Sequence, residues 1–192
     1  MQNKFNRSTL YNLEPIGLGT LKVESFTSYI YRLSKAHNVK VSTLLGRLAL
    51  YDSKEGFNKN KSANFVKYSS VLNNLGEKTQ ILIDKFNELT GRNDLSDLTL
   101  GSIYHISAYG RGIRAKRTWC PNCLFMDEIC NREKYERLVW CFDFISICPF
   151  HDTGLLTICP QCKSEQNYLP STTPLFYCQS CNSSLYNDVC RK

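Results

Sequence analysis

Four pairs of metal-binding residue types occupy the carboxy-terminal third of the sequence. Within each pair, two residues separate the two potential ligands, so one tight turn can direct both side chains toward a single ion. Zn²⁺ takes four such ligands in a tetrahedron, and eight ligands make two closed sites. We therefore predict two structural Zn²⁺ ions, held by Cys120, Cys123, Cys148, His151, Cys159, Cys162, Cys178 and Cys181.

The order of the pairs favours sites built from neighbouring pairs. The last two pairs are both Cys-x-x-Cys, and the residues between them match a zinc-ribbon spacing. An interleaved arrangement, in which Cys120 and Cys123 meet Cys178 and Cys181, stays open. Cys141 follows Trp140 in an apolar run, so we expect it to be a small buried residue.

The cysteine content also bears on the compartment. The chain has 192 residues and ten cysteines, and its first residues lead into no apolar segment of a signal peptide. Paired cysteines without an export signal indicate metal ligands rather than disulfides. No apolar run approaches the roughly 20 residues of a membrane-spanning helix. We predict a cytoplasmic protein with no membrane partner.

Charge and cysteine are unequally distributed along the chain. Basic residues exceed acidic ones up to residue 118, in a chain of net charge +7, and all ten cysteines follow. This distribution predicts an α-helical domain over 1–110, a basic linker over 111–118 and a zinc-binding domain over 119–192. The expected fold is mainly α, with small zinc-binding β/α modules.

Apolar residues recur at helical spacing in the first part. Phe26, Tyr29, Ile30 and Leu33 share one helix face. Gly91 stands where a glycine ends a helix. We expect helices from Phe26 to about Asn38 with Ser25 as N-cap, after Ser42 as N-cap through Ala49, from Glu77 to Leu89, and over 97–108, with a loop over 52–61.

The short turn between the first two helices suggests a helix-turn-helix. A helix that reads bases presents Arg, Asn, Gln or Lys to the major groove, and Arg47 alone does so between Ser42 and Leu50. The sequence therefore favours two helices of a small α-helical core over a helix that reads bases, and docking on a protein partner is compatible with such a core.

Two further segments are candidates for binding. Arg111, Arg114, Lys116 and Arg117 fall within seven residues and can neutralise phosphates, or they form a solvated linker. In the extended amino-terminal segment, the apolar residues either dock on a partner or pack on the protein's own helices. These residues are Tyr11, Leu13 and Ile16.

Several enzyme classes do not fit the sequence. Four-ligand zinc sites are saturated, whereas a catalytic zinc keeps one position open. No His-x-Glu accompanies a Pro-Cys-x-x-Cys, as a deaminase requires. The Gly-x-x-x-x-Gly-Lys-Ser/Thr loop of P-loop ATPases is absent from the sequence. We therefore expect a protein that is not an enzyme.

Taken together, these segments resemble the TniQ family of bacterial transposition proteins, which includes the target selectors called TnsD. The resemblance rests on Glu24-Ser25-x-x-Ser28-Tyr29-x-x-Arg32-Leu33 followed by His37, on Leu98-Thr99-Leu100, and on Trp119-Cys120-Pro121-x-Cys123. It continues through Trp140, Cys148-Pro149-x-His151, Leu155 and Cys159-Pro160-x-Cys162.

The resemblance implies a non-catalytic adaptor with a helix-turn-helix in its first half and zinc ligands at the eight positions. Such proteins recruit a TnsC-like AAA+ ATPase regulator to target DNA. In CRISPR-associated transposons, a short member links that ATPase to an RNA-guided effector complex. The alternative is an autonomous site-specific DNA-binding protein of the TnsD type. The sequence leaves open whether the chain is a short member or part of a longer one, and whether it is a monomer or a homodimer.

Overall fold

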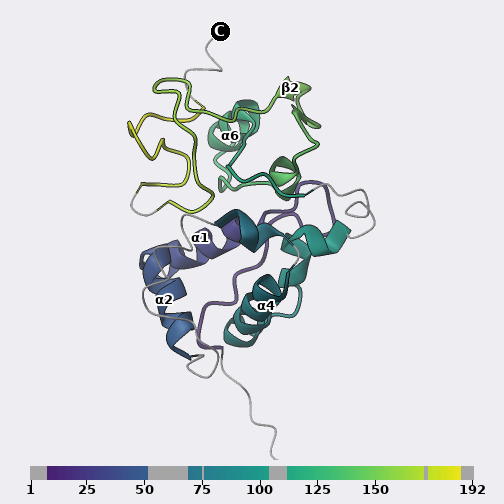
Figure 1. The fold of residues 1–192 in the computed structure, drawn as a ribbon, viewed down its shortest axis with the longest axis vertical. Helices are drawn as coiled ribbons and strands as arrows, with labels where there is room; N and C mark the ends of the chain where they lie inside the picture. The colour runs from purple at the N-terminus through teal and green to yellow at the C-terminus, as the bar shows by residue number, and fades with distance from the viewer. Residues whose placement is uncertain (1–7, 52–68, 75, 104–111, 171–172, 187–192) are drawn as a thin grey trace, which may run out of the picture.

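The structure is a computed structural model that describes residues 8–51, 69–74, 76–103, 112–170 and 173–186; the side chains of 47–51 and 102–103 are not described. Helices α1, α2 and α4 lie at one end of the molecule, and the cysteine-rich segments lie at the other (Figure 1). The loop predicted over 52–61 falls outside the described residues.

Helix α1 (Phe26–Ala36) has the predicted N-cap, because Ser25 Oγ accepts a hydrogen bond from the Ser28 amide at 3.2 Å. The left-handed Asn38, at φ 53°, follows the helix as predicted. Helix α2 (Val41–Tyr51) starts before the predicted N-cap, and Ser42 lies inside it. The reason is that the Lys40 carbonyl already accepts hydrogen bonds from the amides of Thr43 and Leu44, so the helix begins directly after Lys40.

Helix α4 (Glu77–Thr90) ends at Gly91, whose φ of 70° is the left-handed conformation expected of a C-terminal glycine. The helix predicted over 97–108 is wrong in form. Two 3₁₀ helices, η3 (Leu95–Leu98) and η4 (Leu100–Ile103), replace its first part, because Thr99 between them is extended. Residues 104–108 lie outside the described ranges. A further 3₁₀ helix, η2 (Ser69–Asn73), was not predicted.

The cysteine-rich part contains α6 (Pro121–Ile129), the 3₁₀ helix η5 (Leu138–Cys141) and two short strands. Strands β1 (Ile147–Cys148) and β2 (Thr153–Gly154) pair antiparallel, with Cys148 opposite Thr153. The predicted mixture of helices with a small sheet is therefore confirmed. Whether α1 and α2 form a DNA-binding helix-turn-helix stays a prediction.

Two hydrophobic cores hold these elements. The helical core gathers the buried faces of α1, α2 and α4, and Phe26 meets Phe86 edge-on with ring centroids 5.6 Å apart. The second core surrounds Trp119 and Trp140. Leu169, from the cysteine-rich part, is buried in the helical core. Residues on both sides of position 118 thus pack together, and the predicted domain boundaries stay a prediction.

The helices of the described ranges include none that combines the length and apolar character needed to cross a bilayer.

Candidate metal centres and charged residues

The first ligand cluster joins the start of α6 to the β1–β2 turn. Cys123 Sγ lies 3.7 Å from Cys148 Sγ and 3.2 Å from His151 Nδ1, and Cys120 Sγ lies 3.7 Å from His151 Nδ1. Bonds of about 2.3 Å to sulfur and 2.0 Å to nitrogen in a tetrahedron place ligand atoms about 3.5–3.8 Å apart. The four donors therefore match one tetrahedral ion.

The second cluster contains the four remaining paired cysteines. Cys159 Sγ lies 3.7 Å from Cys181 Sγ, and Cys162 Sγ lies 3.5 Å from Cys178 Sγ. In each cluster, all four ligand atoms lie within 4.8 Å of one another. Neighbouring pairs thus meet in space, and the interleaved arrangement does not occur.

Three of the four ligand pairs share one backbone form. The residue after each of these turns has a positive φ, namely 48° at Asp152, 61° at Lys163 and 58° at Asn182. Each donates its amide to the carbonyl of the first ligand of its pair, at 2.9–3.0 Å. The first pair differs, because Cys120 caps α6 and Pro121 occupies the first helical turn.

Hydrogen bonds to the Cys178 sulfur in the second cluster favour its thiolate form. The amides of Ser180 and Cys181 lie 3.4 and 3.5 Å from Cys178 Sγ. Gln166 Nε2 donates to the same sulfur at 3.4 Å. Burial raises the pKa of the Cys178 thiol, but the Ser164 hydroxyl and these amides outweigh it and lower the pKa to about 5. A thiolate is the form that binds metal ions.

Both clusters can hold a metal ion, and their donor sets are the Cys₃His and Cys₄ sets of structural zinc. Four protein donors saturate a tetrahedral ion, which leaves no position for water or a substrate. The arrangement suits stabilising a fold rather than hydrolysis.

Comparison with protein-family models gives a match to the TniQ family over residues 15–155. The chain belongs to the TniQ family. TniQ proteins are associated with transposition. The matched span contains the first ligand cluster and ends before the second. No curated protein matches the chain.

The TniQ signature residues near α1 hold segments of this protein together. The buried Glu24 carboxylate accepts from Arg32 Nη1 at 2.5 Å and from the Ile16 amide at 3.0 Å. Burial raises the pKa of Glu24 to about 7, against the Arg32 charge, which lowers it. Ser28 Oγ accepts from the Glu136 amide at 3.1 Å, which ties α1 to the cysteine-rich part. These residues therefore position the metal-binding half on the helices.

The apolar residues of the amino-terminal segment, which the sequence offered as a docking site, contact α1 and the residue that follows it. Tyr11 stacks on His37 with ring centroids 4.2 Å apart, and its amide donates to His37 Nε2. Its side chain is exposed, whereas Leu13 packs against the helical core. The Leu13 carbonyl accepts from the Tyr29 hydroxyl. Ile16 is half-buried. Tyr11 thus presents a surface, while Leu13 takes part in the protein's own packing.

Arg117, a candidate for phosphate contact in the sequence, is buried in the structure. Its side chain is 0% exposed, because Arg117 forms an ion pair with Glu136 and donates to the Leu175 carbonyl. Its guanidinium also lies against the rings of Trp119 and Phe176, at 5.6 and 5.2 Å. A partner such as Glu136, far away in sequence, leaves no local signal.

Arg114 and Lys116 have protein partners as well. Arg114 donates to the carbonyls of Phe142 and Ile145, at 3.1 and 2.8 Å. Lys116 Nζ donates to Asn167 Oδ1 at 3.0 Å and remains partly exposed. These contacts occupy much of the donor capacity that the sequence suggested for phosphates.

The other two nucleic-acid candidates are not placed. Arg111 lies outside the described residues. Arg47 belongs to α2, but its side chain is not among those described. Both remain predictions.

Another buried ion pair, which no pattern in the sequence had indicated, lies beside the first ligand cluster. Asp127 Oδ2 on α6 lies 2.9 Å from Arg137 Nη2, and both side chains are almost wholly buried. The Arg137 guanidinium also lies 4.8 Å from the Trp140 ring. Trp140 and Cys141 are buried in η5, and for Cys141 this confirms the prediction.

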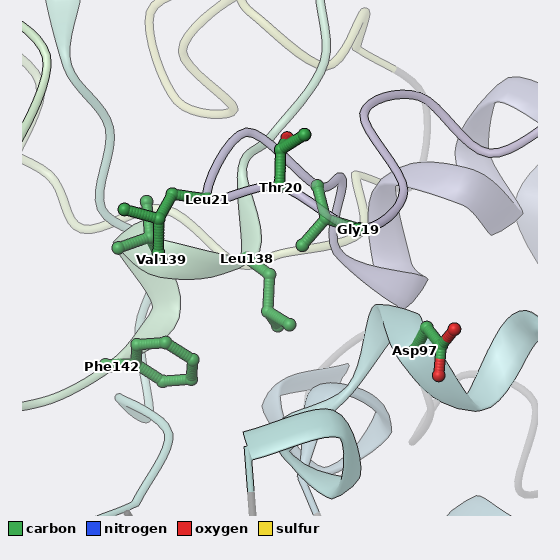
Figure 2. Close-up of a pocket in the computed structure, with 8 residues that line it drawn as sticks. Gly19, Thr20, Leu21, Asp97, Leu138, Val139 and Phe142 are labelled. Atoms are coloured by element: carbon green, nitrogen blue, oxygen red, sulfur yellow. The ribbon is translucent and has the colours of Figure 1, made fainter.

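An apolar pocket of about 490 Å³ opens between the loop before α1, η3 and η5. Leu21, at its mouth, is 69% exposed. Figure 2 shows Leu21 beside Val139, with Asp97 on the opposite side. Exposed apolar side chains next to such a pocket are typical of protein-binding surfaces. The lining residues are Gly19, Thr20, Leu21, Val23, Asp97, Leu138, Val139 and Phe142.

Proposed function

We propose that this TniQ-family protein is a non-catalytic transposition adaptor. It binds a TnsC-like AAA+ ATPase regulator at target DNA and connects that ATPase to an RNA-guided effector complex in the cytoplasm. The observation that carries the proposal is the family match over residues 15–155.

The two ligand clusters support a structural role for metal. We assign one Zn²⁺ to each cluster, since the Cys₃His and Cys₄ sets and their spacing fit it. The free energy of metal binding adds to the free energy of folding in a part with few regular elements. When bound, the ions cross-link the turns, and the protein residues present the binding surfaces.

The pocket between the loop before α1, η3 and η5 offers an apolar surface for a protein partner. The pocket beside Leu21 is lined by residues within the matched span. The exposed Tyr11 ring stacks on His37 and does not line this pocket. We assign ATPase binding to the pocket, because burying an exposed leucine and the pocket wall removes apolar surface from water.

A second candidate function is autonomous recognition of a DNA site through α2. The observation in its favour is that α1 and α2 pack together across a turn of four residues. That function predicts a discrete footprint by the purified protein alone at physiological salt.

A pull-down separates the two functions. The purified protein, with its zinc quantified, is immobilised and offered the TnsC-like ATPase with and without ATP and duplex DNA. We expect capture that requires both, by a protein that carries two zinc ions. Leu21→Asp should abolish capture. The control Ile129→Asp changes an exposed aliphatic residue of α6 that does not line the pocket, and it should not abolish capture. Absence of capture together with a footprint by the protein alone would favour the second function.

A further inference from the structure

A second pocket, of about 330 Å³, lies where the α1–α2 turn meets the segment before the last ligand pair. The end of α1 and the turn form one wall, and Pro170, Thr173 and Pro174 form the other. We call this pocket the lysine cleft. Its two walls come from parts of the chain more than 120 residues apart, so no sequence motif marks it.

Hydrogen bonds hold both walls of the lysine cleft in place. The Leu175 amide donates to the Tyr31 hydroxyl at 3.2 Å, which connects the second wall to α1. Within the turn, the Asn38 amide donates to the Lys35 carbonyl at 2.9 Å, and the Val39 amide donates to the Ser34 carbonyl at 3.0 Å. The cleft is therefore a preformed feature of the fold.

Two lysines supply the charge of this cleft. Lys35 and Lys40 both line it, and none of its described lining residues is acidic. Lys35 has one acidic neighbour, Glu133, with 4.0 Å between Nζ and Oε1 and with both side chains more than half exposed. Such a pair is weak and is screened by salt. Among the described residues, Lys40 forms no ion pair.

The cleft differs in this respect from the basic run of the sequence. Arg117 is buried against Glu136, and Arg114 donates to two carbonyls. The cations of the lysine cleft have no comparable partners and face open space. They are free to exchange their counterions for a ligand, which is the source of salt-dependent affinity.

The chemistry of the cleft fits a phosphate group. Lysine is a common phosphate-binding residue and acts on phosphate as a point charge. Asn38 and Thr173 add an amide and a hydroxyl to the lining, and such groups commonly contact nucleic-acid backbones. We propose that the lysine cleft binds the phosphodiester backbone of a nucleic acid, through Lys35 and Lys40. This inference rests on the proposed function, in which the protein works at nucleic acid.

The test measures binding by fluorescence anisotropy across a salt series, with a 30-base-pair duplex DNA and a hairpin RNA as separate probes. Each phosphate contact contributes about 0.9 to the slope of log affinity against log salt. Lys35→Ala with Lys40→Ala should make the slope for the bound nucleic acid less negative by about 1.8 and weaken binding several-fold at low salt. Lys35→Arg with Lys40→Arg should retain the wild-type slope.

The matched control removes two charges elsewhere. Lys78→Ala with Lys85→Ala lies on α4, which does not line the cleft, and should leave the slope unchanged. Zinc content and circular dichroism verify that every variant is folded. A salt slope that becomes less negative in the double alanine variant, with either probe, supports the proposal. The probe that binds more tightly identifies the nucleic acid.

Two results would overturn it. They are a wild-type slope in the double alanine variant and the same loss of slope in the α4 control. Failure of the adaptor proposal looks different, because ATPase capture would then be absent while the anisotropy slopes still depended on Lys35 and Lys40.

Discussion

Arg117 and Glu136 form an ion pair that is buried on all sides, where three segments of the cysteine-rich part meet. Arg117 also donates to the Leu175 carbonyl and lies against the Trp119 and Phe176 rings. One side chain thus joins the segment that enters the first cluster to the segment that precedes the last ligand pair. A residue that the sequence suggested for DNA is part of the interior.

Replacing Arg117 should therefore affect folding stability rather than DNA binding. Arg117→Met leaves a buried carboxylate without its partner, and breaking such a pair costs about 3–5 kcal/mol. Burial already raises the pKa of Glu136 to about 7, and Arg117 lowers it. Without Arg117 that pKa rises further, so the loss of stability should be larger at pH 8 than at pH 6. Urea unfolding at both pH values measures it.

Lys116→Met is the matched control for Arg117→Met. Lys116 is partly exposed, and its pairing with Glu165 spans 3.9 Å, so the loss should stay within about 0.5 kcal/mol. Equal stability losses in the two variants would contradict the buried position of Arg117.

Metal removal should unfold the cysteine-rich part. Structural zinc sites bind with about 10–16 kcal/mol of apparent free energy, which becomes folding free energy. Cys148→Ser should lower the zinc content from two ions to one, and Cys178→Ser should do the same at the other cluster. Elemental analysis and tryptophan fluorescence follow both changes, since Trp119 lies in the core beside the first cluster.

Cys130→Ser is the control for these substitutions. Cys130 is exposed and belongs to neither cluster, so this variant should keep both ions. A lowered zinc content in Cys130→Ser, or an unchanged one in Cys148→Ser, would refute the ligand assignment.

The stability contributed by Glu24 should depend on pH. Its pKa is about 7 in the folded protein and near 4.5 in an unfolded chain. A raised folded-state pKa favours the protonated carboxyl, so its contribution is complete below pH 4.5 and is lost as the pH rises through 7. Relative to Glu24→Gln, the wild-type protein should lose a few kcal/mol between pH 4.5 and 7 and change little above that, since each pKa unit corresponds to about 1.4 kcal/mol.

Unfolding of both proteins across this pH range checks the prediction. Glu14→Gln, at an exposed glutamate of the same segment, should show no such trend. A difference between wild type and Glu24→Gln that is constant with pH would count against a raised pKa.

Substitutions of Ser25 and Ser42 test which of the two predicted N-caps is one, since the structure places Ser25 at the start of α1 and Ser42 inside α2. Ser25→Ala removes the N-cap of α1 and should cost about 1–2 kcal/mol. Ser42→Ala lies inside α2 rather than at its cap and should cost less than about 0.5 kcal/mol. Thermal unfolding compares the two, and a larger effect at Ser42 would restore it as the N-cap.

Local patterns in the sequence were sufficient for the helices and for the ligand pairs. The apolar period around Tyr29, the cap at Ser25 and the glycine at position 91 each act within one or two turns of helix, so they can be recognised without the fold. A two-residue gap between ligands likewise encodes a single turn. The extended Thr99, which divides the predicted helix over 97–108 into η3 and η4, has no such local signal.

By itself, the sequence determined the eight candidate metal ligands, the helices around Tyr29 and Phe86, and a fold of helices with a small sheet. Only the tertiary structure decided which ligand pairs meet, that Arg117 is buried, and that Lys35 and Lys40 share a cleft with Pro174. The physical reason is range. Caps, periods and ligand turns are short-range interactions, whereas burial and charge pairing depend on which distant segments the hydrophobic cores bring together.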